Sequence, residues 1–239
     1  MVGTSSTPSE NASAQSAREG SLANLSQQLA DFAATVKRPD EAKKAINEAF
    51  EEIEAKGLVP GLGIGDLAPD FTLPDARGGG VRLSERLAKG PVVLIFYRGS
   101  WCPYCNLELR AYQAALPEFE SAGASLVAVS PQRPDDTLSM AEKNELAFDV
   151  LSDAEQDVLE AYRIRFELPE GITEHMLEGT LAALARQQPN GRFSLPVPAT
   201  YVIDPEGRVR ARHVSMAYRT RMEPADALAA IREIQAERS

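Results

Sequence analysis

The chain has 239 residues and a formal net charge of −10, with 44% hydrophobic and 25% charged residues, as in an ordinary globular protein. This acidic balance argues against a nucleic-acid surface and against an anionic membrane surface, since both select clustered Lys and Arg. No apolar stretch is long enough to cross a bilayer, and the N-terminus lacks the basic and apolar regions of a secretory signal, so a cytoplasmic protein is expected.

The first part of the chain is expected to form an extension. Residues 1–20 are rich in Ser, Ala, Asn, Gln and Gly, a composition typical of a disordered tail. Residues 21–57 carry apolar side chains at helical spacing, interrupted at Pro39, and predict a helical hairpin. We expect this hairpin to pack against the main domain. A homodimer contact is left open, because the first apolar stripe has heptad-like spacing.

After a Gly- and Pro-rich linker, strands and helices alternate from residue 64 to residue 239. Strands are expected at 71–73, 92–97, 125–130, 148–151, 200–203 and 209–214. Helices are expected at 83–87, 103–120, 135–144, 154–162, 173–186 and from Pro224 onward. This order predicts an α/β domain with a mixed central sheet and helices on both faces.

The stretch VVLIFYRGSWCPYC, residues 92–105, contains the only two cysteines of the chain. Cys102 lies where a buried strand leads into a helix, and Pro103 suits the first helical turn. Free N–H groups and the positive end of the helix dipole favour a thiolate at that position. The spacing of Cys102 and Cys105 places both sulfurs on one helix face, where a second thiol can resolve an oxidised first one.

Three other interpretations of the cysteine pair are weaker. A structural zinc site needs about four ligands, and the two histidines, His175 and His213, have no zinc-finger spacing. Two inert core cysteines would rarely share this spacing at a helix start. A static disulfide would close too short a loop to stabilise the fold. Redox chemistry at Cys102 and Cys105 is therefore favoured, with no metal or organic cofactor.

The chain resembles the peroxiredoxin-like (alkyl hydroperoxide reductase C / thiol-specific antioxidant) family over about residues 64–239. The resemblance lies in Ala68-Pro69-Asp70-Phe71, in the strand ending Phe96-Tyr97 with a cysteine after it, and in LSD at 151–153 and ATYVID at 199–204. It implies a thioredoxin fold. The tetrapeptide CPYC is also that of glutaredoxins, and Trp101 before it is similar to thioredoxin.

The resemblance departs from the family's peroxidase signature at several positions. Alignment on Phe96-Tyr97 puts Arg98 at the signature proline, Cys102 at the threonine and Cys105 at the peroxidatic cysteine, while Pro198 replaces the distant arginine. A Cys-X-X-Cys pair facing a proline is similar to thioredoxin instead. A cis peptide bond between Val197 and Pro198, beside the cysteines, is therefore expected. Arg98 is the candidate for the missing cation.

These features lead to three functional hypotheses. The first is a peroxidase that reduces hydroperoxides through a Cys102–Cys105 disulfide, which thioredoxin or a similar dithiol reduces. The second is a thioredoxin- or glutaredoxin-like thiol–disulfide oxidoreductase acting on disulfides. The third is a redox-sensing interaction module that binds through residues 21–57. In the first two, Arg98, Trp101, Pro103 and Pro198 support the cysteines.

Both histidines, His175 and His213, and a short polar stretch near the C-terminus are expected to have no catalytic role. His213 shares a strand face with Val209 and Ala211 and is expected to be partly buried and hydrogen-bonded. Arg219, Thr220 and Arg221 are interpreted as a solvated turn.

Overall fold

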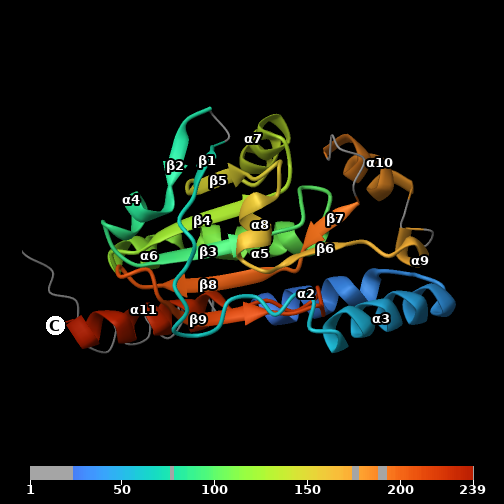
Figure 1. The fold of residues 1–239 in the computed structure, drawn as a ribbon, viewed down its shortest axis with the longest axis horizontal. Coiled ribbons are helices and arrows are strands. Elements are labelled where there is room, and N and C mark those ends of the chain that lie inside the picture. The colour runs from blue at the N-terminus through green and yellow to red at the C-terminus, as the bar shows by residue number, and fades with distance from the viewer. Residues whose placement is uncertain (1–23, 76–77, 174–177, 188–192, 239) are drawn as a thin grey trace, which may run out of the picture.

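The computed structural model describes residues 24–75, 78–173, 178–187 and 193–238. Its centre is a five-stranded sheet of order β5-β4-β3-β8-β9 (Figure 1). The strands are β3 (Val92–Phe96), β4 (Ser125–Ser130), β5 (Asp149–Ser152), β8 (Ala199–Ile203) and β9 (Val209–Val214). β3, β4 and β5 are parallel, whereas β8 runs antiparallel to β3 and β9 antiparallel to β8. The predicted mixed α/β architecture is confirmed.

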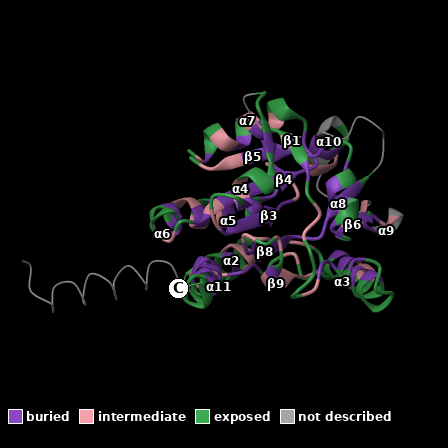
Figure 2. Cartoon of the chain, turned by 60° about the vertical axis from the view of Figure 1, so that its left-hand side comes forward, coloured by how far each residue is buried: buried purple, intermediate pink, exposed green. Residues whose placement is uncertain are grey.

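β3 is the middle strand, and both of its faces are buried, as its continuous apolar run predicts. Figure 2 shows the central strands in the purple of buried residues. Because side chains alternate along a strand, β3 contributes to two core clusters. Val92, Leu94 and Phe96 face one cluster, and Val93, Ile95 and Tyr97 face the other.

Helices cover both faces of the sheet. The cluster with Val93 and Ile95 receives side chains from α2 (Leu25–Thr35), α5 (Pro103–Ala114), α6 (Leu116–Ser121), α7 (Pro134–Lys143) and α11 (Pro224–Arg238). The cluster with Leu94 and Phe96 receives them from α3 (Asp40–Ala55), α4 (Leu83–Leu87), α8 (Asp157–Ala161), α9 (Glu170–Thr173) and α10 (Glu178–Gln187). None of the helices within the described ranges has the length and apolar character needed to span a bilayer.

The two N-terminal helices, α2 and α3, bury their apolar residues in different clusters. Leu25 and Leu29 of α2 pack on the α5 side, and Ile46 and Phe50 of α3 pack on the other. α2 contacts α5, and α3 contacts α9. The expected packing against the main domain is therefore present, with each helix on its own face of the sheet. The predicted tail, residues 1–20, lies outside the described residues.

Several element boundaries differ from the sequence prediction. The helix expected at 103–120 is divided between α5 and α6, because Pro117 lacks the N–H that would continue the helical hydrogen bonds. β1 (Thr72–Pro74) matches the strand expected at 71–73, but its antiparallel partner β2 (Gly80–Arg82) was not predicted, nor was the antiparallel pair of β6 (Arg165–Glu167) and β7 (Ser194–Pro196). These three strands have only three residues each, which is too short for an alternating pattern to be recognised.

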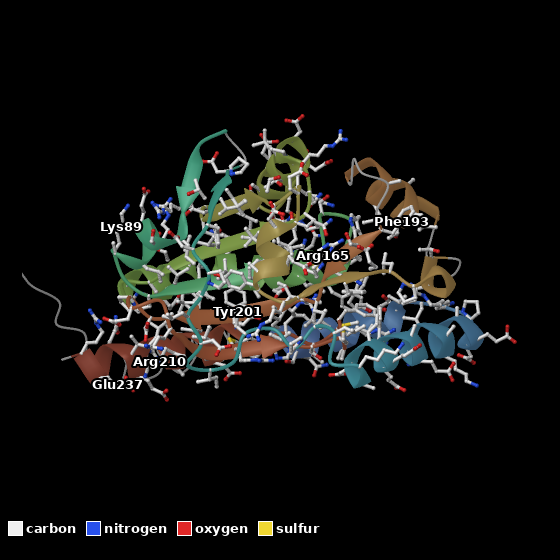
Figure 3. All side chains as sticks on the ribbon, viewed as in Figure 1. Lys89, Arg165, Phe193, Tyr201, Arg210 and Glu237 are labelled. Carbon is white, nitrogen blue, oxygen red and sulfur yellow. The ribbon has the colours of Figure 1, made fainter. Side chains whose placement is uncertain are left out.

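Side-chain contacts tie the outer elements to the sheet. The hydroxyl of Tyr201, labelled in Figure 3, accepts a hydrogen bond of 3.1 Å from the backbone N–H of Leu62 in the linker. Arg210 of β9 pairs with Glu237 of α11 at 2.5 Å, and both are labelled at the opposite end of the molecule from α9. The linker and the last helix are therefore both fixed to the β8-β9 side.

The predicted cis peptide bond at Val197–Pro198 is wrong, because that bond is trans. The backbone N–H of Val197 donates to the carbonyl of Ile164 at 2.7 Å, next to the β6-β7 pairing, and β8 begins at Ala199. The chain thus passes in an extended conformation from one sheet into the next. A trans proline fits this path, and Pro198 opens a strand, as prolines often do.

Candidate functional site

Both cysteines lie at the start of α5, directly after β3. Cys102 is the N-cap residue and Pro103 occupies the first turn, as predicted. The backbone N–H of Cys102 donates to the carbonyl of Gly99 at 3.1 Å, and Gly99 has a φ of 145°. A φ in this region favours glycine. Gly99 therefore permits the turn that brings Cys102 back toward Arg98.

The two thiols are free, fully buried and unequal. Burial alone would raise the pKa of Cys102. The hydrogen bond from the Cys105 thiol and the positive charges of Arg98 and Arg221 outweigh burial, so the pKa of Cys102 lies well below its usual range. Burial and the hydrogen bond to Cys102 raise the pKa of Cys105. These opposite pKa shifts favour the thiolate at Cys102 and the protonated thiol at Cys105.

Arg98 contacts Cys102, as is needed if it replaces the arginine of the family signature. Its Nη2 donates to the Cys102 Sγ at 3.3 Å. The guanidinium also stacks on two aromatic rings, 4.4 Å from the Tyr218 centroid and 5.2 Å from the Trp101 centroid. These cation–π contacts hold the Arg98 guanidinium beside the Cys102 sulfur. No carboxylate among the described residues forms an ion pair with it.

Arg221 is a second cation at the site, and its assignment to a solvated turn is wrong. Its side chain is only 1% exposed, and its Nε pairs with Glu108 at 2.6 Å. Its Nη2 lies 3.6 Å from the Cys105 Sγ, and Nη1 donates to the carbonyls of Tyr218 and Thr220 at 2.6 Å. Arg221 thus closes the far side of the cysteine pair.

One sequence signal could have revealed Arg221. Glu108 lies three residues after Cys105, between the buried Cys105 and Tyr112 of the same helix face. A carboxylate in that position is stable only with a charged or hydrogen-bonding partner. Glu108 accepts from Arg221 and, at 3.4 Å, from the hydroxyl of Thr200. The pattern of α5 therefore demands a buried cation, although it does not say which one.

A buried amide network fixes the loop before Cys102. The Asn106 amide donates to the carbonyls of Ser100 and Cys102, both at 2.9 Å. The Gln132 side chain, at the end of β4, accepts from the Ser100 N–H at 2.7 Å and donates to its hydroxyl at 3.0 Å. Asn144 donates to the Asn106 oxygen at 3.0 Å. These contacts set the position of Cys102 relative to Arg98.

The remaining predicted residues lie at different distances from this centre. Trp101 and Pro103 line a pocket next to Arg98. Pro198 is buried and precedes Ala199, which pairs with Phe96 at the end of β3.

No histidine among the described residues forms a hydrogen bond with either cysteine. His213 is partly buried and contacts the Thr220 hydroxyl through Nε2 at 3.2 Å, as expected. His175 lies outside the described residues. Within the described part, no three His, Cys, Asp or Glu side chains come together as a metal site.

The comparisons with known proteins find one matching family and relatives named for two activities. The family model described as AhpC/TSA family matches residues 64–212. A Mycobacterium tuberculosis protein named as a peroxiredoxin is 29% identical over 145 residues, which is 61% of this chain and 80% of that protein. The thiol-disulfide oxidoreductase ResA of Geobacillus kaustophilus is 27% identical over 150 residues, 62% of this chain and 68% of ResA. The crystal structure of peroxidoxin BcpB from M. tuberculosis superimposes with a TM-score of 0.57 at 27% identity, covering 72% of this chain and 97% of BcpB.

Proposed function

Because this chain belongs to the AhpC/TSA family, it is a thiol-dependent oxidoreductase of the peroxiredoxin kind, and we propose that Cys102 is its peroxide-reducing residue. The predicted family and its thioredoxin fold are confirmed. The roles of the individual residues and the identity of the reductant are our proposal.

One observation carries the assignment of Cys102. Its sulfur accepts hydrogen bonds from both Arg98 and the Cys105 thiol, and a second guanidinium, that of Arg221, lies behind Cys105. The thiolate is the nucleophilic form of cysteine. Alignment with the family signature would instead make Cys105 the attacking residue. The charges around the two sulfurs favour Cys102, because burial and the hydrogen bond to Cys102 raise the pKa of Cys105.

The reaction follows from these positions. The Cys102 thiolate attacks the outer oxygen of a hydroperoxide, so an S–O bond forms and the O–O bond breaks. The leaving alkoxide takes a proton and departs as an alcohol, and Cys102 becomes a sulfenic acid. Cys105 then attacks the Cys102 sulfur, and the oxygen leaves as water with the Cys105 proton. The resulting disulfide returns to two thiols when a dithiol reductant is oxidised.

Arg98 and Arg221 have distinct tasks in this scheme. Arg98 stabilises the Cys102 thiolate, and its Nε is buried without a hydrogen-bond partner among the described residues, so it can donate to a peroxide oxygen. Arg221 holds Glu108 and lies against Cys105, the resolving thiol. Trp101 and Tyr218 keep the Arg98 guanidinium in place.

The physiological reductant is proposed to be thioredoxin or a similar dithiol protein. Both sulfurs are 0% exposed in the dithiol form, so a protein reductant needs the start of α5 to open after the disulfide forms. A cytoplasmic location, where such reductants maintain thiols, is proposed as well. The apolar stripe of α2 that left a homodimer contact open packs within the chain, since Leu25 and Leu29 are buried on the α5 side.

The test is peroxide reduction coupled to thioredoxin, thioredoxin reductase and NADPH, run beside insulin reduction. Wild-type protein is expected to consume NADPH only when peroxide is present and to leave insulin intact. Mass mapping after mild oxidation should show the loss of two hydrogens within residues 99–110, as an intramolecular disulfide requires. Absence of peroxide-dependent turnover with every dithiol reductant tried would overturn the proposal.

Thiol–disulfide exchange is the second candidate, and two observations favour it. The Cys102-Pro-Tyr-Cys105 motif starts a helix, and a similar protein is named as a thiol-disulfide oxidoreductase. Two observations weigh against it. Both sulfurs are buried, and Pro198 has a trans peptide bond, which removes the main argument for a thioredoxin-like substrate groove. Rapid insulin reduction without peroxide turnover would make this candidate the function.

A further inference from the structure

A pocket of about 170 Å³ lies beside Arg98 and Trp101. Its walls come from α2, α3, the start of α5 and the stretch between β6 and β7. Most of the wall is apolar or aromatic, including Phe32, Ile46, Phe50, Ile172, Leu195 and Tyr218. A dry apolar cavity of about 150 Å³ is large enough to bind benzene. The pocket can therefore hold an aromatic ring or a segment of alkyl chain.

Much of this pocket lies outside the family domain. The family match begins at residue 64, whereas the wall residues Phe32, Val36, Ile46 and Phe50 precede it. Phe32 packs edge-on against Tyr104 of the CPYC motif, with ring centroids 5.1 Å apart. Phe50 packs in the same way against Tyr218, at 5.7 Å. The N-terminal helices thus add a binding surface directly to the redox centre.

The polar groups of the pocket favour an anionic ligand. Arg38 and Arg98 line it, and no carboxylate stands among its described lining residues. Arg98 is occupied by Cys102 and two aromatic rings, whereas Arg38 forms no ion pair with any described side chain. The Nε1 of Trp101 is a buried donor without a partner in the described part of the chain. The pocket therefore combines an apolar wall, an unpaired cation and free donors beside the thiolate.

We propose that this pocket binds a carboxylate-bearing apolar substrate, with its carboxylate at Arg38 and its reacting group at Arg98 and Cys102. The substrate class is an organic hydroperoxide whose alkyl or aryl body carries a carboxylate. Its reduction follows the steps given above, with the carboxylated body on the alcohol that leaves. The substrate role rests on the proposed peroxidase function, whereas binding of the carboxylate does not.

Binding can be measured without any turnover. Trp101 is the only tryptophan of the chain and lines the pocket, so its fluorescence reports on occupancy. Decanoate is expected to give a saturable change and to bind more tightly than decanol. Arg38→Gln should weaken decanoate binding on the order of tenfold and leave decanol binding unchanged. Arg38→Lys should recover most of the loss, and Lys37→Gln, one residue away and outside the pocket lining, is the matched control.

A second variant tests the apolar wall. Thr180 lines the pocket from α10, so Thr180→Phe should weaken decanoate and decanol alike by filling space. If Thr180→Phe is not folded by circular dichroism, Val36→Phe fills the pocket from the end of α2. Bound decanoate should also slow the alkylation of Cys102 by iodoacetamide. No saturable response, or equal binding of decanoate and decanol by wild-type protein, would overturn the assignment.

The kinetic arm compares a carboxylated alkyl hydroperoxide with its methyl ester and with hydrogen peroxide. Arg38→Gln is expected to lower kcat/KM for the acid on the order of tenfold and to leave hydrogen peroxide reduction unchanged. An equal loss with all three peroxides would contradict a role of Arg38 in substrate choice. If decanoate binds through Arg38 but no peroxide turns over, the peroxidase proposal fails and the binding site stands.

Discussion

Cys102 and Cys105 lie one helical turn apart on α5, but the surroundings of their sulfurs differ. Cys102 contacts a guanidinium, that of Arg98, which stacks on Tyr218 and Trp101 at the edge of a pocket. Cys105 lies near a second guanidinium, that of Arg221, which is sealed in the core and paired with a carboxylate. The first cation has spare donors, whereas the second is neutralised by Glu108.

Because the two arginines have different partners, we expect one to control the reactivity of the cysteines and the other to stabilise the fold. The positive charge of Arg98 is available to the Cys102 thiolate, because no carboxylate contacts it in the described part of the chain. The charge of Arg221 is shared with Glu108, and removal of either partner would leave a buried charge. We therefore expect changes on the Cys102 side to affect chemistry and changes on the Cys105 side to affect stability first.

The largest effect is expected from exchange of the cysteines themselves. Cys102→Ser should reduce peroxide consumption to the uncatalysed rate, because it removes the thiolate. Cys105→Ser should keep a single turnover, with a sulfenic acid on Cys102 that a dimedone probe traps. Stopped-flow peroxide consumption measures both. If Cys105→Ser is inactive and Cys102→Ser still forms a sulfenic acid, the family register is right and our assignment is wrong.

Breaking the sealed ion pair should give the largest loss of stability. Arg221→Met leaves the Glu108 carboxylate buried and unpaired, which costs about 3–5 kcal/mol of unfolding free energy. Urea unfolding followed by circular dichroism measures the change. The double variant Glu108→Leu with Arg221→Met should regain most of this loss, since an apolar pair of similar volume often replaces a buried ion pair without cost. A double variant as unstable as the single one would contradict this account.

Removal of the other cation should change reactivity more than stability. Arg98→Met should slow Cys102 alkylation at mildly acidic pH on the order of tenfold, because the loss of a neighbouring positive charge raises the pKa of the thiol. Iodoacetamide rates against pH give the measurement. Arg219→Gln is the matched control, since Arg219 also stacks on Tyr218, at 5.5 Å. Equal slowing in both variants would mean that the ring contact, and not the charge at sulfur, controls Cys102.

The two sides of α5 also differ in how well the sequence predicts them. The start of the helix and the position of Cys102 follow from local rules of strand, turn and helix capping, whereas the role of Arg98 as a cation was expected from the family resemblance. Arg221 escaped prediction because it is 116 residues from Cys105 and follows a loop whose residues Arg219 and Thr220 are exposed. The only sequence feature that indicated a buried cation was Glu108, which lies on the buried face of α5. Long-range pairing of this kind depends on how elements pack, which periodicity does not reveal.

The pocket wall was equally hard to foresee. The apolar spacing of residues 21–57 predicts helices, but it does not say that α2 and α3 pack on opposite faces of the sheet. The trans bond at Pro198 shows a related limit. Its position before a strand matched a thioredoxin-like pattern, and the unpredicted β6-β7 pair then fixed the backbone in an extended path.

The smallest expected effect concerns how α2 is held on the Cys102 side. The N-cap residue Asn24 makes no side-chain hydrogen bond to the helix. The Glu223 carboxylate instead accepts from the backbone N–H groups of Leu25 at 3.0 Å and Ser26 at 2.7 Å. A carboxylate at this position satisfies two free donors and interacts favourably with the helix dipole.

Glu223→Ala should therefore lower the unfolding free energy by about 1 kcal/mol, the usual cost of a lost cap. Because α2 supplies Phe32 and Val36 to the pocket, the same change should alter Trp101 fluorescence. Glu223→Gln keeps an acceptor oxygen and should lose less. Glu233→Ala, an exposed glutamate of α11, is the control and should leave both measurements unchanged. If Glu223→Ala lowers stability but leaves the Trp101 signal unchanged, α2 does not set the shape of the pocket beside Cys102.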